Sequence, residues 1–93
     1  MKNDVLRVAA NSPLALVAGA IAGQIREKQQ SDIQAIGMVA AYRMLKSVIT
    51  AQKFLEAEGV QIVCAPRFVE VDIDEERCTA IRLTICAHRN GVL

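Results

Sequence analysis

The residues of this sequence that could take part in chemistry are clustered acids, thiols near a histidine, and cations. The clustered acids lie between two strand-like stretches, from Asp72 to Glu76. Paired carboxylates can act as a general acid and base, but these do not have the spacing of a calcium-binding loop. We interpret Asp74–Glu76 as a solvated turn that joins two strands into a hairpin.

The thiols do not form a recognisable metal or catalytic motif. Cys64, Cys78 and Cys86 lack CxxC spacing, and His88 is the only histidine. A tetrahedral zinc site would need all four residues. A Cys86–His88 pair could share one side of a strand, but nothing in the sequence supplies the third group that would orient it. We expect reduced thiols that behave as small hydrophobic residues.

Sequence motifs of enzymes are also missing. The chain contains no GxGxxG, no Walker motif and no nucleophile elbow. We therefore expect a protein that is not an enzyme and that has neither a metal nor a cofactor.

The cations form a ribbon along one predicted helix. Arg43, Lys46 and Lys53 follow one another at i, i+3 and i+10. The net charge is only +1, so affinity for a polyanion would have to come from such a local patch. Two readings remain open: the ribbon contacts nucleic acid, or it is the solvated side of the helix. Further cations are expected at the end of the first helix (Arg26, Lys28) and on the hairpin (Arg67, Arg77, Arg82, Arg89).

A glycine marks the junction between a predicted strand and this helix. The stretch IQAIGMVA turns from strand to helix at Gly37. Free N–H groups at a helix N-terminus bind anions. A small anionic ligand at this corner is therefore a third, weaker reading.

The elements that position these residues follow the order β-α-β-α-β-β in a single α/β domain, residues 1–93, with a core at about 5–88. We expect strands at 5–10, from about Asp32 and from Val60, and a helix from Met38 to about 57. The first helix is expected after Ser12 as N-cap, with Pro13 at the first helical position. Gly19 and Gly23 inside it suggest a close approach of another backbone.

The uncharged stretch from Val8 to Ile25 resembles the apolar part of a signal peptide. Asn11, Ser12, Pro13 and two glycines make it a poor membrane span. We interpret it as part of a cytoplasmic protein without membrane contact.

The hairpin strands alternate regularly. Val69, Val71 and Ile73 are expected inward together with Ile81, Leu83 and Ile85. A turn at Asp74–Glu76 would bring Cys64 close to Cys86. Pro66 indicates a bulge or an edge strand.

The second helix carries more apolar residues than contact with one sheet requires. This excess predicts a subunit interface in a homodimer or tetramer, formed by helix two and the hairpin strands. The candidate interface residues are Tyr42, Met44, Leu45, Val48, Phe54 and Phe68.

Five stretches of the chain resemble the stage V sporulation protein S family. They are SPLALVAGAIAGQIRE, IQAIGMVA, LKSVITAQKFL, GVQIVCAPRF and RCTAIRL, and the resemblance extends from Val5 to Ala87. It implies a β-α-β-α-β-β domain like that of Alba, the archaeal chromatin protein, with an extended C-terminal hairpin. It also implies a bacterial regulator of sporulation, although the family occurs in bacteria that do not sporulate.

Compared with Alba, this chain keeps the order of helices and strands better than it keeps the charged residues. Alba's corner reads Ala-Arg-Gly-Arg, whereas this chain has Ala35-Ile36-Gly37-Met38. Alba's lysine pair before helix one is replaced by Asn11 and Ser12, and its basic hairpin tip is acidic here. Lys53 and Phe54 match Alba's basic residue followed by Phe. The resemblance and the ribbon of Arg43, Lys46 and Lys53 together predict the contacts that a nucleic acid would make. Lys46 and Lys53 would neutralise phosphates, and Asn11, Ser12 and the N–H groups after Gly37 would hold backbone oxygens without charge.

Two hypotheses for function follow. The first is a non-enzymatic regulator that binds DNA or RNA as an Alba-like dimer. The second is a structural or protein-interaction module whose assembly is itself the function, without nucleic acid.

Overall fold

The computed structural model describes residues 4–89, which form two helices and one four-stranded sheet. The elements in chain order are β1 (Leu6–Val8), α1 (Leu14–Lys28), β2 (Gln30–Ala35), α2 (Met38–Glu56), β3 (Val60–Ile73) and β4 (Glu76–Arg89). This confirms the predicted β-α-β-α-β-β order. Strand β2 begins at Gln30 and not near Asp32, because Gln29 ends α1 in a left-handed conformation (φ 68°) and the chain enters the sheet at once.

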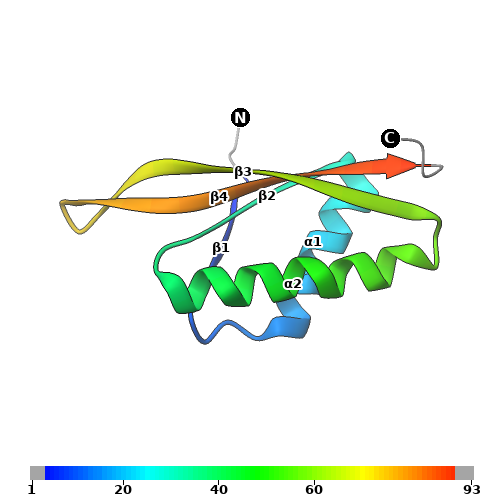
Figure 1. Cartoon of the computed structure of the whole chain (residues 1–93), viewed down its shortest axis with the longest axis horizontal. Helices are drawn as coiled ribbons and strands as arrows, with labels where there is room; N and C mark the ends of the chain where they lie inside the picture. The colour runs from blue at the N-terminus through cyan, green and yellow to red at the C-terminus, as the bar shows by residue number, and fades with distance from the viewer. Residues whose placement is uncertain (1–3, 90–93) are drawn as a thin grey trace.

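The strands are arranged in the order β1-β2-β4-β3, with β1 parallel to β2 and the other neighbours antiparallel. Both helices lie on one side of this sheet, and the hairpin of β3 and β4 extends past the helices (Figure 1). Side chains of alternate residues project from opposite sides of a strand. The sheet therefore has one face covered by helices and one outer face without them.

The core lies between the helices and the sheet and is almost entirely aliphatic. Ile21 and Ile25 of α1 meet Ile33 of β2 and Ile85 of β4, all fully buried. On α2 the buried residues are Ala40, Met44, Ser47, Val48, Ala51 and Leu55. The core stripe of α2 thus alternates small residues with the larger Met44 and Leu55, which are among the largest fully buried side chains.

The start of α1 differs from the prediction. Pro13 is the N-cap and no side chain caps the helix. The Ser12 hydroxyl instead accepts a hydrogen bond from the Ala9 N–H (2.8 Å) and closes the turn before the helix. The expected close backbone approach at Gly19 and Gly23 is also absent among the described residues, because nothing lies within 4 Å of a Cβ built at either position.

The hairpin turn is one residue shorter than predicted. Strand β3 ends at Ile73 and β4 begins at Glu76, so Asp74 and Glu75 alone form the turn, both at positive φ. Two-residue turns of this hand match the twist of the strands.

The shorter turn shifts the register of the hairpin by one residue. Val69 lies opposite Ala80, and Phe68 lies opposite Ile81. A shift of one residue exchanges the two faces of a strand. Val69, Val71 and Ile73 therefore project from the outer face, and not from the face of Ile81, Leu83 and Ile85 as predicted.

Strand β3 is an edge strand, as one of the two readings of Pro66 required. Pro66 lies opposite Leu83 in a ladder that continues without a bulge from Val60 to Ile73. Cys64 is opposite Ile85, and Cys86 is opposite Val63. The two thiols consequently belong to opposite faces of the sheet, and both are free.

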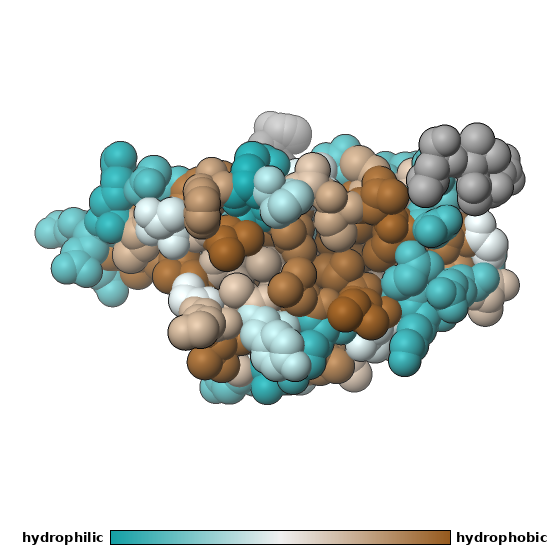
Figure 2. Space-filling view, in the orientation of Figure 1, coloured by the Kyte–Doolittle hydropathy of each residue, from teal (hydrophilic) through white to brown (hydrophobic). Residues whose placement is uncertain are grey.

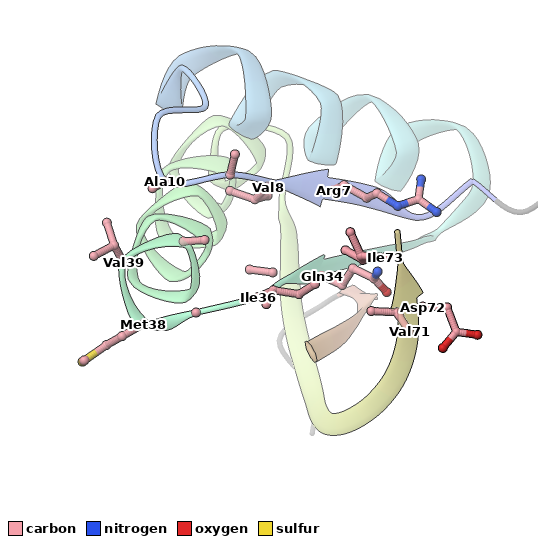
Figure 3. Close-up of a pocket in the computed structure, with 14 residues that line it drawn as sticks. Arg7, Val8, Ala10, Gln34, Ile36, Met38, Val39, Val71, Asp72 and Ile73 are labelled. Carbon is pink, nitrogen blue, oxygen red and sulfur yellow. The ribbon is translucent and has the colours of Figure 1, made fainter. Parts of the chain in front are cut away.

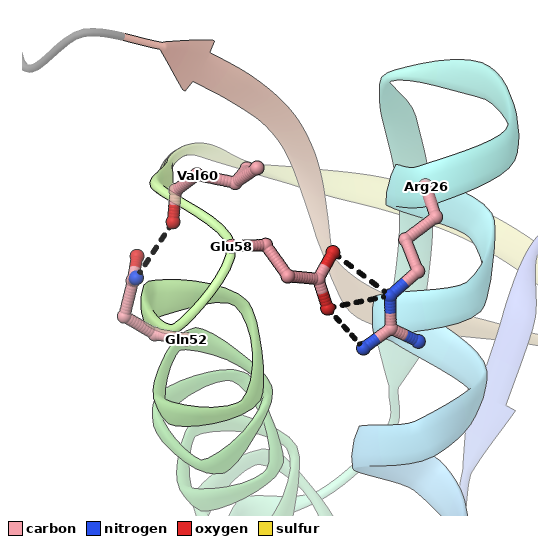
Figure 4. A network of polar contacts seen from close by, with 4 residues as sticks. All are labelled: Arg26, Gln52, Glu58 and Val60. Atoms are coloured by element: carbon pink, nitrogen blue, oxygen red, sulfur yellow. Dashed lines mark hydrogen bonds and ion pairs between the residues drawn. The ribbon is translucent and has the colours of Figure 1, made fainter.

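Two side-chain contacts hold the end of α2 in place (Figure 4). Gln52 donates from Nε2 to the Val60 carbonyl (3.2 Å) and accepts from the Ile62 N–H (2.8 Å). The Glu58 carboxylate receives hydrogen bonds from Nε and NH2 of Arg26, the shortest 2.7 Å long. These bonds to Glu58 raise the pKa of Arg26. The far end of α2 is thus tied to both β3 and α1.

Candidate functional site

Helix α2 exposes a continuous row of apolar side chains that no described part of the chain covers. Met38, Tyr42, Leu45 and Ile49 repeat at helical spacing, and each is at least half exposed. Phe68 of the neighbouring edge strand is 75% exposed, and its partner Ile81 places it on the helix-covered side of the sheet. We call these five residues the apolar band. Figure 2 shows hydrophobic side chains gathered between β3 and α2 on this side of the molecule.

Only some of the candidate interface residues belong to the apolar band. Tyr42, Leu45 and Phe68 belong to the apolar band. Met44 and Val48 are only 1% and 8% exposed and pack in the chain's own core, because they lie on the sheet-facing side of α2. These two side chains are therefore not available to a partner.

Phe54, the last candidate interface residue, is partly exposed but does not join the band. Nine residues after Leu45, it is about two and a half helical turns further along. It consequently projects from the side of α2 opposite Leu45.

Arg43 is held by the loop that leads into α1. Its Nε donates to the Ala10 carbonyl (2.7 Å) and its NH1 to the Ser12 carbonyl (3.1 Å). The structure thus brings three candidate residues, Asn11, Ser12 and Arg43, into one corner. Two of the five N–H donors of Arg43 are used within the chain.

The two lysines of the ribbon are more accessible. Lys46 is exposed, and its Nζ lies 4.7 Å from the centre of the Tyr42 ring, which is a cation–π contact. Lys53 is exposed about 10 Å further along the helix. No ion pair of the described residues involves either lysine. Lys46 thus adjoins the apolar band, and both charges are free to meet an anion.

Gly37 forms the corner between β2 and α2 beside a cleft of about 620 Å³. It is the N-cap of α2 at φ 94°, and neither a capping side chain nor an acid in the first turn neutralises this helix end. The cleft is bordered by the ends of β1 and β2 and by residues 71–73 of the hairpin (Figure 3). Its lining is mainly apolar, with Arg7 on one side and Asp72 on the hairpin. A site for a small anion at this corner stays a prediction.

The thiols and the histidine do not converge on one centre. Cys86 and His88 share a face of β4, opposite Val63 and Gln61. The His88 Nε2 is buried without a hydrogen-bond partner among the described residues. Burial, and to a smaller extent Cys86, raises the pKa of Cys64. A raised pKa lowers the fraction of Cys64 that is present as thiolate.

Three arginines that are far apart in the sequence become neighbours in the sheet. Arg7 lies on β1, Arg67 on β3 and Arg82 on β4, and the strand order places them in one line on the outer face of the sheet. The alternation of Ile81, Leu83 and Ile85 in the sequence indicates that Arg82, between them, points outward. Only the order β1-β2-β4-β3 could show that the three are neighbours.

None of the helices among residues 4–89 is both long enough and apolar enough to cross a membrane.

Comparison with known proteins agrees with this geometry. Among solved structures, the fold is similar to Alba from Thermoplasma volcanium, with a TM-score of 0.56 at 15% sequence identity. The match covers 88% of this chain and 98% of the Alba chain. At this identity the likeness establishes an Alba-like fold. In sequence, residues 4–88 match the family described as Stage V sporulation protein S (SpoVS). With nearly its whole length matched, this chain belongs to the Stage V sporulation protein S family.

Proposed function

We propose that this protein is a non-enzymatic regulator that forms a homodimer and binds nucleic acid through it. The observation that carries this proposal is the surface of α2. There an apolar band that no described residue covers adjoins Lys46 and Lys53, neither of which has an ion pair among residues 4–89. The sporulation family and the Alba-like fold support the same function.

The apolar band supports the dimer. Complete burial of one large aliphatic side chain contributes about 1.5–3 kcal/mol. Leu45 and Ile49 are each at least half exposed, so covering both in two copies contributes several kcal/mol. A symmetric dimer buries the same patch on each subunit, which fits a band on one helix and an edge strand.

The lysines support nucleic-acid binding. Lys46 and Lys53 are exposed on the side of α2 next to the band. A dimer built on the band would carry two such pairs. Binding would be governed by phosphate contacts, so affinity should fall steeply as salt rises from about 50 to 200 mM.

The test is fluorescence anisotropy with labelled duplex DNA, single-stranded DNA and RNA at several salt concentrations. We expect binding at low salt, and Lys46→Gln with Lys53→Gln should weaken it. The control is Lys28→Gln with Arg77→Gln, which changes net charge equally at exposed positions outside α2 and outside the outer face of the sheet. Failure of the wild-type chain to bind any of the three probes at low salt would refute nucleic-acid binding.

Arg43 and the hairpin favour a second candidate, an interaction module without nucleic acid. Arg43 is occupied by the Ala10 and Ser12 carbonyls, and the hairpin tip carries Asp74 and Glu75. This candidate predicts an intact dimer that binds none of the nucleic-acid probes. The same measurements therefore separate the two functions.

A further inference from the structure

The outer face of the sheet carries a line of arginines that crosses all four strands. Arg7 pairs with Gln34, Gln34 with Arg82, and Arg82 with Arg67. Paired residues on neighbouring strands project from the same face, and their sequence neighbours Val8, Ile33 and Leu83 are buried on the helix side. We call Arg7, Arg67 and Arg82 the arginine row. With strands about 4.8 Å apart, the row is about 14 Å long.

Neutral side chains, and not acids, hold the arginine row. Arg82 donates from Nε and NH2 to the Gln34 Oε1, at 2.9 and 2.6 Å. Arg67 donates from NH1 to the Thr84 hydroxyl at 2.9 Å. Arg7 is exposed and makes no described hydrogen bond. The ion pairs among residues 4–89 belong to other cations, namely Arg26, Lys28 and Arg77.

One carboxylate lies near the row on the same face. Asp32 lies opposite Thr84, and this pair is two residues along the strands from the pair of Gln34 and Arg82. Its Oδ1 is buried and has no hydrogen-bond partner among the described residues. Glu76 lies on the same face at the end of the hairpin, six residues from Arg82. Three guanidinium groups against these two carboxylates leave the face with a net positive charge.

Two like charges face each other in this arrangement. Arg67 and Arg82 lie directly opposite each other, and like charges at such positions repel. Gln34 is only 5% exposed, so its amide is a fixed support that orients the Arg82 guanidinium. Oriented guanidinium groups without acidic partners are suited to bidentate contact with phosphate.

We propose that the arginine row is a phosphate-binding surface that contacts the backbone of a nucleic acid. This inference rests on the proposed function and adds a second surface to it. The apolar band belongs to α2 and to the helix-covered side of β3, so a dimer formed through the band leaves the row exposed. The aromatic residues of the chain are Tyr42 and Phe54 on α2 and Phe68 on the helix-covered side. The arginine row therefore contacts phosphates without stacking on bases, and its binding does not depend on the nucleotide sequence.

The experiment measures anisotropy of labelled single-stranded DNA, RNA and duplex DNA with the full chain at several salt concentrations. Arg7→Gln with Arg67→Gln should weaken binding and reduce the slope of log affinity against log salt by about 1.4–1.8, the loss of two phosphate contacts. The matched control, Lys28→Gln with Arg77→Gln, removes equal charge elsewhere and should leave the slope unchanged. A preference among the three probes identifies the kind of nucleic acid.

A second readout separates loss of contact from loss of fold. Arg67→Gln removes the opposed charge, so the free protein should keep or raise its Tm while binding more weakly. Weaker binding together with a lower Tm would contradict the proposal, because it would indicate damage to the sheet.

The outcomes also separate this inference from the proposed function. If the wild type binds and only Lys46→Gln with Lys53→Gln reduces the salt slope, nucleic-acid binding stands and the arginine row is overturned. If polyglutamate competes as well as nucleic acid for the row, the partner is an acidic protein and the proposal is also overturned. If no probe binds, the proposed function itself fails.

Discussion

At the scale of single residues, Arg43 shows how a cation can serve the fold. Its guanidinium group spans the Ala10 and Ser12 carbonyls and fixes the loop between β1 and α1 against α2. Lys53, ten residues along the same helix, is exposed and has no described ion pair. Two cations of one predicted ribbon thus have different surroundings.

We therefore expect Arg43→Met to lower the free energy of unfolding by about 1–3 kcal/mol, because two charge-assisted hydrogen bonds are lost. Lys53→Met should stay within about 0.5 kcal/mol of the wild type. Urea unfolding followed by circular dichroism measures both. Equal stability of the two variants would show that the loop contacts do not stabilise the chain.

At the scale of elements, the junction of β2 and α2 depends on a backbone conformation that suits glycine. Gly37 has φ 94° and ψ 156°, and a Cβ at this position would meet no atom within 4 Å. Its role is therefore conformational and not steric. Gly23 lies inside α1, where alanine is the better helix former, and it also has open space around it.

The two glycines should respond in opposite directions to the same substitution. Gly37→Ala should destabilise the chain by about 1–3 kcal/mol through backbone strain. Gly23→Ala should stabilise it by about 0.5–1 kcal/mol. Thermal and urea unfolding measure both, and a neutral Gly37→Ala would contradict the strain argument.

At the scale of the whole molecule, the apolar band is the feature that predicts assembly. The band includes residues of α2 and of the edge strand β3. The free edge of the sheet therefore lies next to the apolar side of the helix (Figure 2). Exposed apolar surface of this kind usually marks an interface. The outer sheet face with the arginine row lies away from it.

Leu45→Glu with Ile49→Glu should convert a dimer into a monomer, because burying a charge at the interface opposes association. Leu16→Glu with Ala20→Glu is the matched control, since both residues are exposed on α1 outside the apolar band. Sedimentation equilibrium at micromolar concentration measures the state of each. A wild-type chain that is monomeric under these conditions would refute the dimer.

Much of the fold could be predicted from the sequence. Periodicity gave the element order and located α2 from Met38 to within a residue of its end, because apolar spacing follows directly from helix geometry. It did not distinguish the stripe of α2 that meets the sheet, with Met44 and Val48, from the stripe that stays exposed, with Leu45 and Ile49. Both stripes are apolar, and only packing selects one.

By itself, the sequence determined the elements, the Gly37 corner and the excess of apolar residues on α2. The tertiary structure decided the register of the hairpin, the use of Arg43 and the alignment of Arg7, Arg67 and Arg82. The physical reason is that periodicity depends on residues a few positions apart, whereas a line across a sheet depends on which strands become neighbours. A two-residue turn at Asp74–Glu75 then fixes which side chains share a face.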